Sequence, residues 1–144
     1  MRKIAEEAGV TCPECGAPRV EGMTCWEQLG AILAWEWQDP ELQAEHFLTV
    51  ACYNLQHPAQ FTDEALAGLG IALADYLEGM PTQEIRRRNS RAYEGNKRVL
   101  KPEAERQPAL KHWSKTIADV YIPDHPEGAA QRVRDWGAAI RAER

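Results

Sequence analysis

Apolar side chains recur every three or four residues along much of this chain, which is the spacing that buries one face of a helix. The first such helix is predicted to begin at Thr24, because Thr24 and Glu27 have the spacing of a capping box. It ends at Asp39-Pro40, since a proline disfavours helical backbone at the residue that precedes it. Its expected buried face consists of Trp26, Leu29, Ile32, Leu33 and Trp37.

Further helices follow towards the C-terminus. A second starts at Pro40 and runs to about residue 56, where His57-Pro58 stops it. A third spans residues 62–79, and a fourth begins at Thr82 and continues through an arginine-rich stretch. Residues 94–111 are predicted to form a loop, followed by a short helix from Thr116 and a last helix over residues 129–142. The inner faces comprise Leu66, Leu69, Ile71, Leu73 and Leu77 in the third helix and Val133, Trp136 and Ile140 in the last.

The sequence shows no strand-like alternation of any length and no internal repeat, so the predicted fold class is all-α. A chain of 144 residues with 44% apolar residues fits one domain, residues 1–144, that buries a core without disulfides. We expect a compact helical bundle in three parts. Residues 1–23 form a knuckle, residues 24–57 a helical hairpin onto which it docks, and residues 58–144 the remaining helices and loop.

The chain contains no apolar stretch of membrane-spanning length and no signal-like start, because Met1-Arg2-Lys3 is followed at once by Glu6 and Glu7. We therefore expect a cytoplasmic protein that does not contact membranes. In a reducing compartment, four cysteines are more naturally metal ligands or buried thiols than two disulfides.

The net charge of −5 is distributed unevenly. Residues 1–84 contain three basic and fourteen acidic side chains, a net charge of −11, whereas residues 85–101 contain seven basic side chains and one acidic, a net charge of +6. A basic stretch can contact nucleic acid. The competing and favoured interpretation is that it offsets the acidic N-terminal part of the same molecule, so we expect at most weak nucleic-acid binding.

Four residues in the first part of the chain, three cysteines and one histidine, are candidate ligands of one metal ion. Cys12 and Cys15 lie in Cys-Pro-Glu-Cys-Gly, a turn that brings two thiolates within reach of one ion, and Cys25 follows. Either His46 or His57 would complete a tetrahedron, and Zn²⁺ favours four such ligands. A redox dithiol, an iron site or four ordinary thiols are the alternatives.

Helix geometry chooses between the two histidines. His46 and His57 are separated by roughly 16 Å along one helix, so they cannot bind one ion together. In a hairpin that turns at residues 39–40, Cys25 lies about 22 Å from the turn and His57 about 26 Å, at nearly one level. The predicted set is therefore Cys12, Cys15, Cys25 and His57, whereas Cys52 points elsewhere on its helix as a small buried hydrophobe.

These motifs carry a resemblance. Cys-Pro-x-Cys-Gly, Cys25-Trp26, Glu36-Trp37-x-Asp39-Pro40 and the run His-Phe-Leu-Thr-Val-x-x-Tyr-x-x-Gln-His-Pro from residue 46 resemble an uncharacterised bacterial domain-of-unknown-function family, number 5946. The resemblance is dense over residues 12–58 and thinner afterwards. It implies a metal site at the same Cys and His residues and no particular activity. The family pattern has Asp where this chain has Ala51, so any catalytic role of that acid is absent here.

Other polar and aromatic residues have plainer interpretations beside functional ones. Glu36 and His46 should meet near the hairpin turn, either as a buried pair that fixes the register or as an acid/base or metal pair. Tyr53 could hydrogen-bond a histidine, although such a residue is more often core. Residues 35–37 could line a pocket but are expected to pack. His112 and His125 are expected to be solvated.

The function that the sequence supports best is a zinc-binding helical protein that acts as a binding or regulatory module for an unknown protein partner or small ligand. The first alternative is a metal-dependent enzyme, hydrolase-like, that uses an open metal position or the pair Glu36 and His46. The second alternative is a nucleic-acid module based on residues 85–101.

Overall fold

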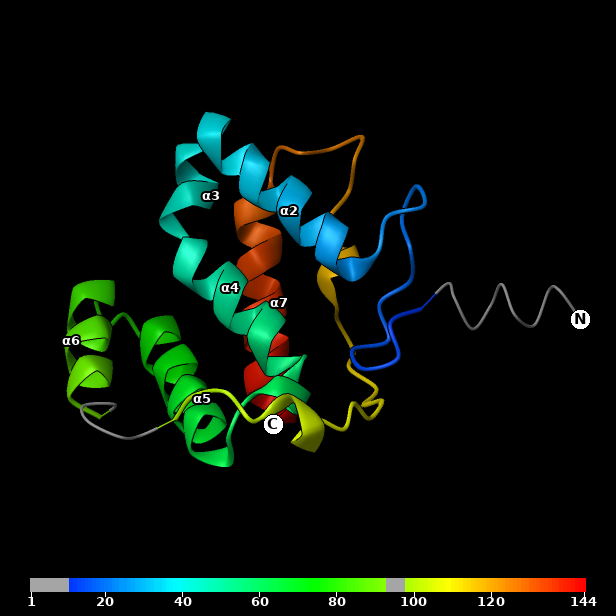
Figure 1. Cartoon of the computed structure of the whole chain (residues 1–144). Coiled ribbons are helices and arrows are strands. Elements are labelled where there is room, and N and C mark those ends of the chain that lie inside the picture. The colour runs from blue at the N-terminus through cyan, green and yellow to red at the C-terminus, as the bar shows by residue number, and fades with distance from the viewer. Residues whose placement is uncertain (1–10, 93–97) are drawn as a thin grey trace, which may run out of the picture.

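The computed structural model describes residues 11–92 and 98–144, and these segments fold as helices and loops (Figure 1). The all-α prediction is confirmed. Short 3₁₀ turns, labelled η, separate several of the α-helices. The α-helices are α2 (Cys25–Trp35), α3 (Pro40–Ala44), α4 (His46–Leu55), α5 (Asp63–Leu77), α6 (Thr82–Ala92) and α7 (Ala129–Glu143), and the 3₁₀ turns are η1 (Glu36–Gln38), η2 (Pro58–Gln60), η3 (Glu103–Glu105) and η4 (Ile117–Asp119).

Helix α7 forms the centre of the bundle. Helices α4 and α5 pack on it and on each other, α3 contacts its first half, and α6 packs on α5 at the outer edge (Figure 1). The knuckle lies beside the start of α2, on the opposite side of the molecule from α6 (Figure 1). The most deeply buried side chains come from these central helices, as amphipathic packing requires. They include Leu42, Leu48, Leu73, Val133, Trp136 and Ile140, and Ile32 of α2 is buried with them.

Most predicted helix starts are correct because side-chain caps determine them. Thr24 and Glu27 form the expected capping box, and the side chain of Thr62 accepts a hydrogen bond from the third amide of α5. Asp39 caps α3 in the same way, with Pro40 in the first turn. Thr116 also begins a capping box, although the helix that follows is only the three-residue turn η4.

The predicted second helix is wrong in one respect, because it breaks at Glu45 into α3 and α4. At the break, the Glu45 carboxylate accepts hydrogen bonds of 2.6 Å from Tyr76 on α5 and from Arg134 on α7. Tyr76 also donates to the carbonyl of Ala44. These contacts join residues far apart in sequence, so helical periodicity alone cannot predict the break.

The predicted buried faces contain three errors. Trp26, Trp37 and Ile71 are exposed, whereas the polar Gln28 is completely buried and Glu36 is 9% exposed. An apolar residue of the predicted stripe can face outwards when a polar neighbour on the same helix faces inwards and forms hydrogen bonds there.

Among the described residues, no helix is both long and apolar enough to cross a membrane.

Gly137 marks the closest approach of α4 to α7. A Cβ built at this position would lie 2.9 Å from Cδ1 of Leu48, which is itself completely buried. We expect Gly137→Ala to lower the free energy of unfolding by about 1–2 kcal/mol, because overpacking costs more than the gain in helix propensity. Chemical denaturation measures this value. The control, measured on dilute protein so that only contacts within one chain count, is Gly30→Ala, which meets no atom of its own chain within 4 Å and should stabilise the protein by about 0.5–1 kcal/mol.

Candidate metal centre

The knuckle turn presents two sulfur atoms to one point. Gly16 adopts a left-handed conformation with φ of 79°, and its amide donates to the carbonyl of Cys12 at 2.9 Å. The amides of Glu14 and Cys15 both donate to Sγ of Cys12 at 3.4 Å, and the amide of Ala17 donates to Sγ of Cys15 at the same distance. Backbone donors aimed at sulfur stabilise thiolates, which are the metal-binding form of cysteine.

The other two members come from the ends of helices. Cys25 is the first residue of α2, directly after its cap, and His57 follows α4 and precedes Pro58. The Nδ1 atom of His57 donates a hydrogen bond of 2.6 Å to the carbonyl of Tyr53. This bond fixes the tautomer, so Nε2 carries its lone pair towards the cysteines.

The four ligand atoms of Cys12, Cys15, Cys25 and His57 all lie within 4.8 Å of one another. His57 Nε2 lies 3.6 Å from Sγ of Cys12 and 3.4 Å from Sγ of Cys25. Bond lengths of about 2.3 Å to sulfur and about 2.05 Å to nitrogen give an N···S edge of about 3.6 Å in a tetrahedral zinc site. The spacing of the donors therefore fits zinc, and these residues lie close enough to bind a metal ion.

The neighbouring thiols have opposite pKa shifts. A hydrogen bond with Cys15 is the main cause that lowers the pKa of Cys25 to about 3; burial opposes this shift, and hydrogen bonds with His57 and Tyr53 add to it. The same bond and burial raise the pKa of Cys15. Burial acts to lower the pKa of His57, but its contacts with Cys25 and with the Tyr53 carbonyl raise it to about 9. Without a metal, the cluster therefore favours a Cys25 thiolate beside a protonated His57, and His57 must lose this proton before its Nε2 can bind a metal ion.

Tyr53 supports this centre and also packs. Its hydroxyl lies 3.6 Å from Sγ of Cys25, and its ring stacks on the His57 ring with centroids 4.0 Å apart. Burial and the contact with Cys25 raise the pKa of the phenol. The expectation that Tyr53 is simply a core residue is therefore incomplete. Cys52 is buried outside the cluster, as predicted, and burial raises the pKa of its thiol.

Two residues that the sequence analysis did not single out dock the knuckle. The Glu14 carboxylate accepts a hydrogen bond of 2.7 Å from the amide of Ala59, two residues after His57. The buried Gln28 side chain donates to the carbonyls of Pro18 and Met23, each at 3.0 Å. The sequence contains a signal for each residue. Glu14 lies within Cys-x-x-Cys, and Gln28 is a polar residue between apolar helix positions.

Glu36 and His46 meet near residues 39–40, as predicted. Nδ1 of His46 donates to both carboxylate oxygens of Glu36, at 2.9 and 3.0 Å. The Glu36 side chain is 10% exposed, whereas the His46 side chain is 52% exposed. A buried carboxylate needs a donor, and this one joins η1 to the first residue of α4.

We expect His46→Ala to lower the free energy of unfolding by about 1–2 kcal/mol, because it leaves the buried Glu36 carboxylate without this donor. Glu36→Gln should also destabilise the protein. The measurement is urea unfolding of both variants. Unchanged stability in both would contradict a structural role and favour a functional pair, since functional groups often sit at some cost to stability.

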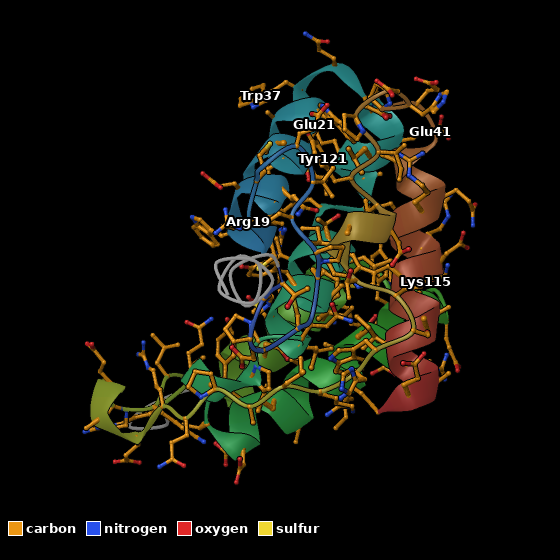
Figure 2. The ribbon with its side chains drawn as sticks, turned by 90° about the vertical axis from the view of Figure 1, so that its right-hand side faces the viewer. Arg19, Glu21, Trp37, Glu41, Lys115 and Tyr121 are labelled. Carbon is orange, nitrogen blue, oxygen red and sulfur yellow. The ribbon has the colours of Figure 1, made fainter. Side chains whose placement is uncertain are left out.

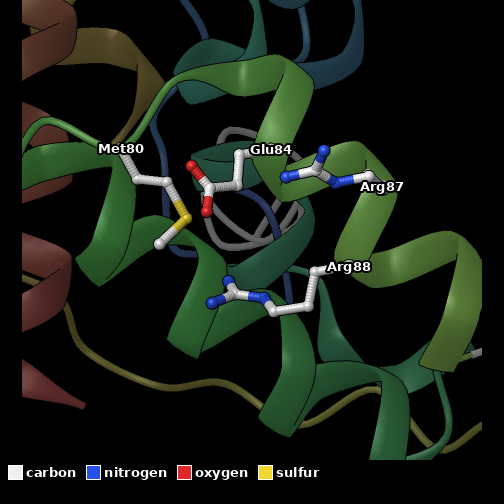
Figure 3. Close-up of a pocket in the computed structure, with 4 residues that line it drawn as sticks. All are labelled: Met80, Glu84, Arg87 and Arg88. Carbon is white, nitrogen blue, oxygen red and sulfur yellow. The ribbon is translucent and has the colours of Figure 1, made fainter.

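Part of the basic stretch is used within the molecule. Nη1 of Arg88 on α6 forms an ion pair of 2.7 Å with Asp75 on α5. Arg87 and Arg88 also border a hollow of about 200 Å³ with Met80 and Glu84, in which the Glu84 carboxylate lies among the cationic groups (Figure 3). The predicted members Arg91, Glu94 and Lys97 fall outside the described side chains.

Nucleic-acid binding through residues 85–101 is expected to be weak and indifferent to sequence, because the excess negative charge of residues 1–84 opposes it. Its affinity should fall steeply as salt increases. Fluorescence anisotropy with single- and double-stranded oligonucleotides over a salt series measures this. Sub-micromolar binding at physiological salt that is lost when Arg86, Arg87 and Arg88 are changed to Glu would show that the prediction is wrong.

The remaining candidate residues, Trp35, His112 and His125, lie where the sequence placed them. Trp35 stacks on Tyr121 with ring centroids 5.2 Å apart, so it packs as expected. It also borders a hollow of about 530 Å³ together with Glu41 and residues 126–128. Figure 2 shows Glu41, Tyr121 and Trp37 at the same end of the molecule. His112 and His125 are exposed, as predicted, and His125 pairs with Glu127 at 3.2 Å.

Comparison with known sequences gives one match. The sequence model of a family described as "Family of unknown function (DUF5946)" matches residues 10–144, nearly the whole chain. No curated protein and no solved structure matches the chain.

Proposed function

The chain belongs to the family of unknown function DUF5946, and we propose that it is a zinc-binding helical protein whose metal has a structural role. The observation that carries this proposal is the convergence of four ligand atoms, from Cys12, Cys15, Cys25 and His57, within 4.8 Å of one another. Three thiolates and one neutral imidazole form a donor set that Zn²⁺ prefers, with the tetrahedral geometry typical of structural sites.

Four protein donors support a structural role over a catalytic one. Catalytic zinc sites keep a position for water or substrate, whereas structural sites fill all four positions with protein atoms. In this protein, Cys15 is 1% exposed, and Cys25 and His57 are each 9% exposed, whereas Cys12 is partly exposed, so solvent reaches the cluster mainly on the Cys12 side. Zinc would hold the four ligands together, and the hydrogen bonds to the cysteine sulfurs and from the His57 ring would orient them.

The ligands come from three separate parts of the chain, which explains what such a site does. Cys12 and Cys15 lie in the knuckle, Cys25 begins α2 and His57 follows α4. The knuckle is short and contributes few residues to the core, so its attachment depends on contacts such as those of Glu14 and on the cluster. We infer that the surface formed by the attached knuckle and the neighbouring ends of α2 and α4 binds a protein partner or small ligand. The protein would then act as a binding or regulatory module.

Elemental analysis of the protein purified without added metal tests the proposal. About one zinc per chain is expected, together with spectroscopic evidence for three sulfur ligands and one nitrogen ligand from X-ray absorption. A folded protein that contains no metal would rule the proposal out. Zinc with three protein ligands and one water would instead support the metal-dependent enzyme.

A further inference from the structure

The solvent-facing side of α2 and η1 carries almost no charge. All of residues 25–38 are described, and Glu27 is the one charged residue among the exposed positions of this segment. Trp26 is 68% exposed and Trp37 is 87% exposed. Figure 2 shows Trp37 projecting away from the ribbon. Exposed tryptophans are rare on a protein surface that binds nothing, and tryptophan is enriched in interaction sites.

Four positions of this side follow a symmetric pattern, with the exposed Ala34 beside them and Leu33 half-buried against the core. Trp26, Gly30, Leu33 and Trp37 are separated by four, three and four residues, so the spacing is the same from either end. The two tryptophans lie roughly 16 Å apart along the helix axis. Between them, a Cβ built at Gly30 would meet no atom within 4 Å. The segment therefore has a bulky side chain at each end and an open, low centre.

We propose that this surface, the α2 face (Trp26, Gly30, Leu33, Ala34 and Trp37), is the contact between two copies of this chain. In the dimer, two α2 helices pack antiparallel about a two-fold axis near the middle of the face. Trp26 of one copy then lies beside the partner's Trp37, and Leu33 packs against the partner's Gly30. A two-fold interface requires one surface to be complementary to itself, and the symmetric spacing meets that requirement.

The charge of the α2 face and the area that it can bury are both compatible with a second copy of this chain. Self-association of a chain with net charge −5 requires an interface that brings no like charges together, and Glu27 lies at the edge of the α2 face rather than within it. A tryptophan buries about 150–250 Å² in an interface, so two of them supply roughly half of the ~800 Å² per partner in a standard interface. An unrelated partner would bury the same tryptophans but would not require symmetric spacing.

Sedimentation equilibrium of the full chain with bound zinc tests the proposal. A dimer that dissociates on dilution is expected, with a dissociation constant in the micromolar range. Gly30→Arg and Trp37→Glu should each weaken association at least about 100-fold, because a charge then lies in the interface. Arginine at position 30 meets open space and improves helix propensity, so this variant should fold with an unchanged or higher melting temperature.

The matched control is Ile71→Arg, which places the same charge at an exposed apolar position on α5 and should leave the dimer intact. The orientation is tested by combining Trp26→Lys with Trp37→Glu. In an antiparallel dimer the new charges pair across the interface, so the double variant should associate more tightly than either single variant. A wild-type protein that remains monomeric at several hundred micromolar, or a dimer unaffected by Gly30→Arg, would overturn the proposal. If the double variant associates no more tightly than the two single variants, the antiparallel arrangement is wrong.

Discussion

Replacing Cys25 by serine is expected to weaken zinc binding at least 100-fold and to lower the melting temperature by about 10 °C or more. The physical reason is that metal binding energy is folding energy when the site does not exist in the unfolded chain, and structural zinc contributes roughly 10–16 kcal/mol in small zinc-dependent peptides. Loss of even about 3–4 kcal/mol shifts the melting temperature of a chain of this size by roughly 6–16 °C. Competition with a chromophoric chelator measures the affinity, and calorimetry measures the melting temperature.

The matched control is Cys52→Ala. Cys52 is completely buried but lies outside the cluster, so this change removes a sulfur atom without removing a ligand. It should keep one zinc per chain and lower the stability by only about 1 kcal/mol, through the lost packing of one sulfur. If both variants lose zinc equally, the metal is not bound by the predicted set.

The histidine ligand requires its own comparison. His57→Ala should weaken zinc binding, because Nε2 of His57 lies 3.4–3.6 Å from two of the sulfur atoms. His46→Ala should keep the metal, since His46 bonds Glu36 instead. Zinc that is retained by His57→Ala but lost by His46→Ala would show that the wrong histidine was chosen.

The grouping of the four Cys and His residues could be predicted from the sequence because it depends on the helical rise per residue. The rise per residue placed Cys25 and His57 at one level of a hairpin and placed Glu36 opposite His46 near the turn. The structure brings both groups together. The break at Glu45 did not disturb this result, since His57 after α4 still lies with the three cysteines and His46 at the start of α4 still bonds Glu36.

Orientation about a helix axis was predicted less well. An error of a few tens of degrees turns a residue from the core to the surface, and the inward side of α2 is determined by Gln28, whose amide bonds two carbonyls of the knuckle. The knuckle has no periodicity from which such contacts could be inferred. Trp26 and Trp37 therefore matched the apolar spacing of a buried face yet lie outside, and the sequence cannot distinguish a core stripe from an interaction stripe.

Trp136 was correctly predicted as part of the core, and its replacement gives the second large effect. It lies on α7 and is completely buried, and it belongs to the same cluster of side chains as Leu48 and Leu73. Trp136→Ala should lower the free energy of unfolding by about 3–5 kcal/mol, because the cavity cannot close around so large a deletion. The exposed control Ile71→Ala should change it by no more than about 0.5 kcal/mol.

A smaller substitution at Trp136 separates packing from hydrogen bonding. The indole Nε1 is buried and has no hydrogen-bond partner among the described residues. An unsatisfied buried donor costs about 1–3 kcal/mol, so Trp136→Phe removes that cost while it gives up part of the ring. The two effects oppose each other, and the net loss should be about 1 kcal/mol or less. Urea unfolding of the zinc-loaded protein measures both variants. A loss for Trp136→Phe as large as that for Trp136→Ala would mean that the indole N–H does find an acceptor in solution.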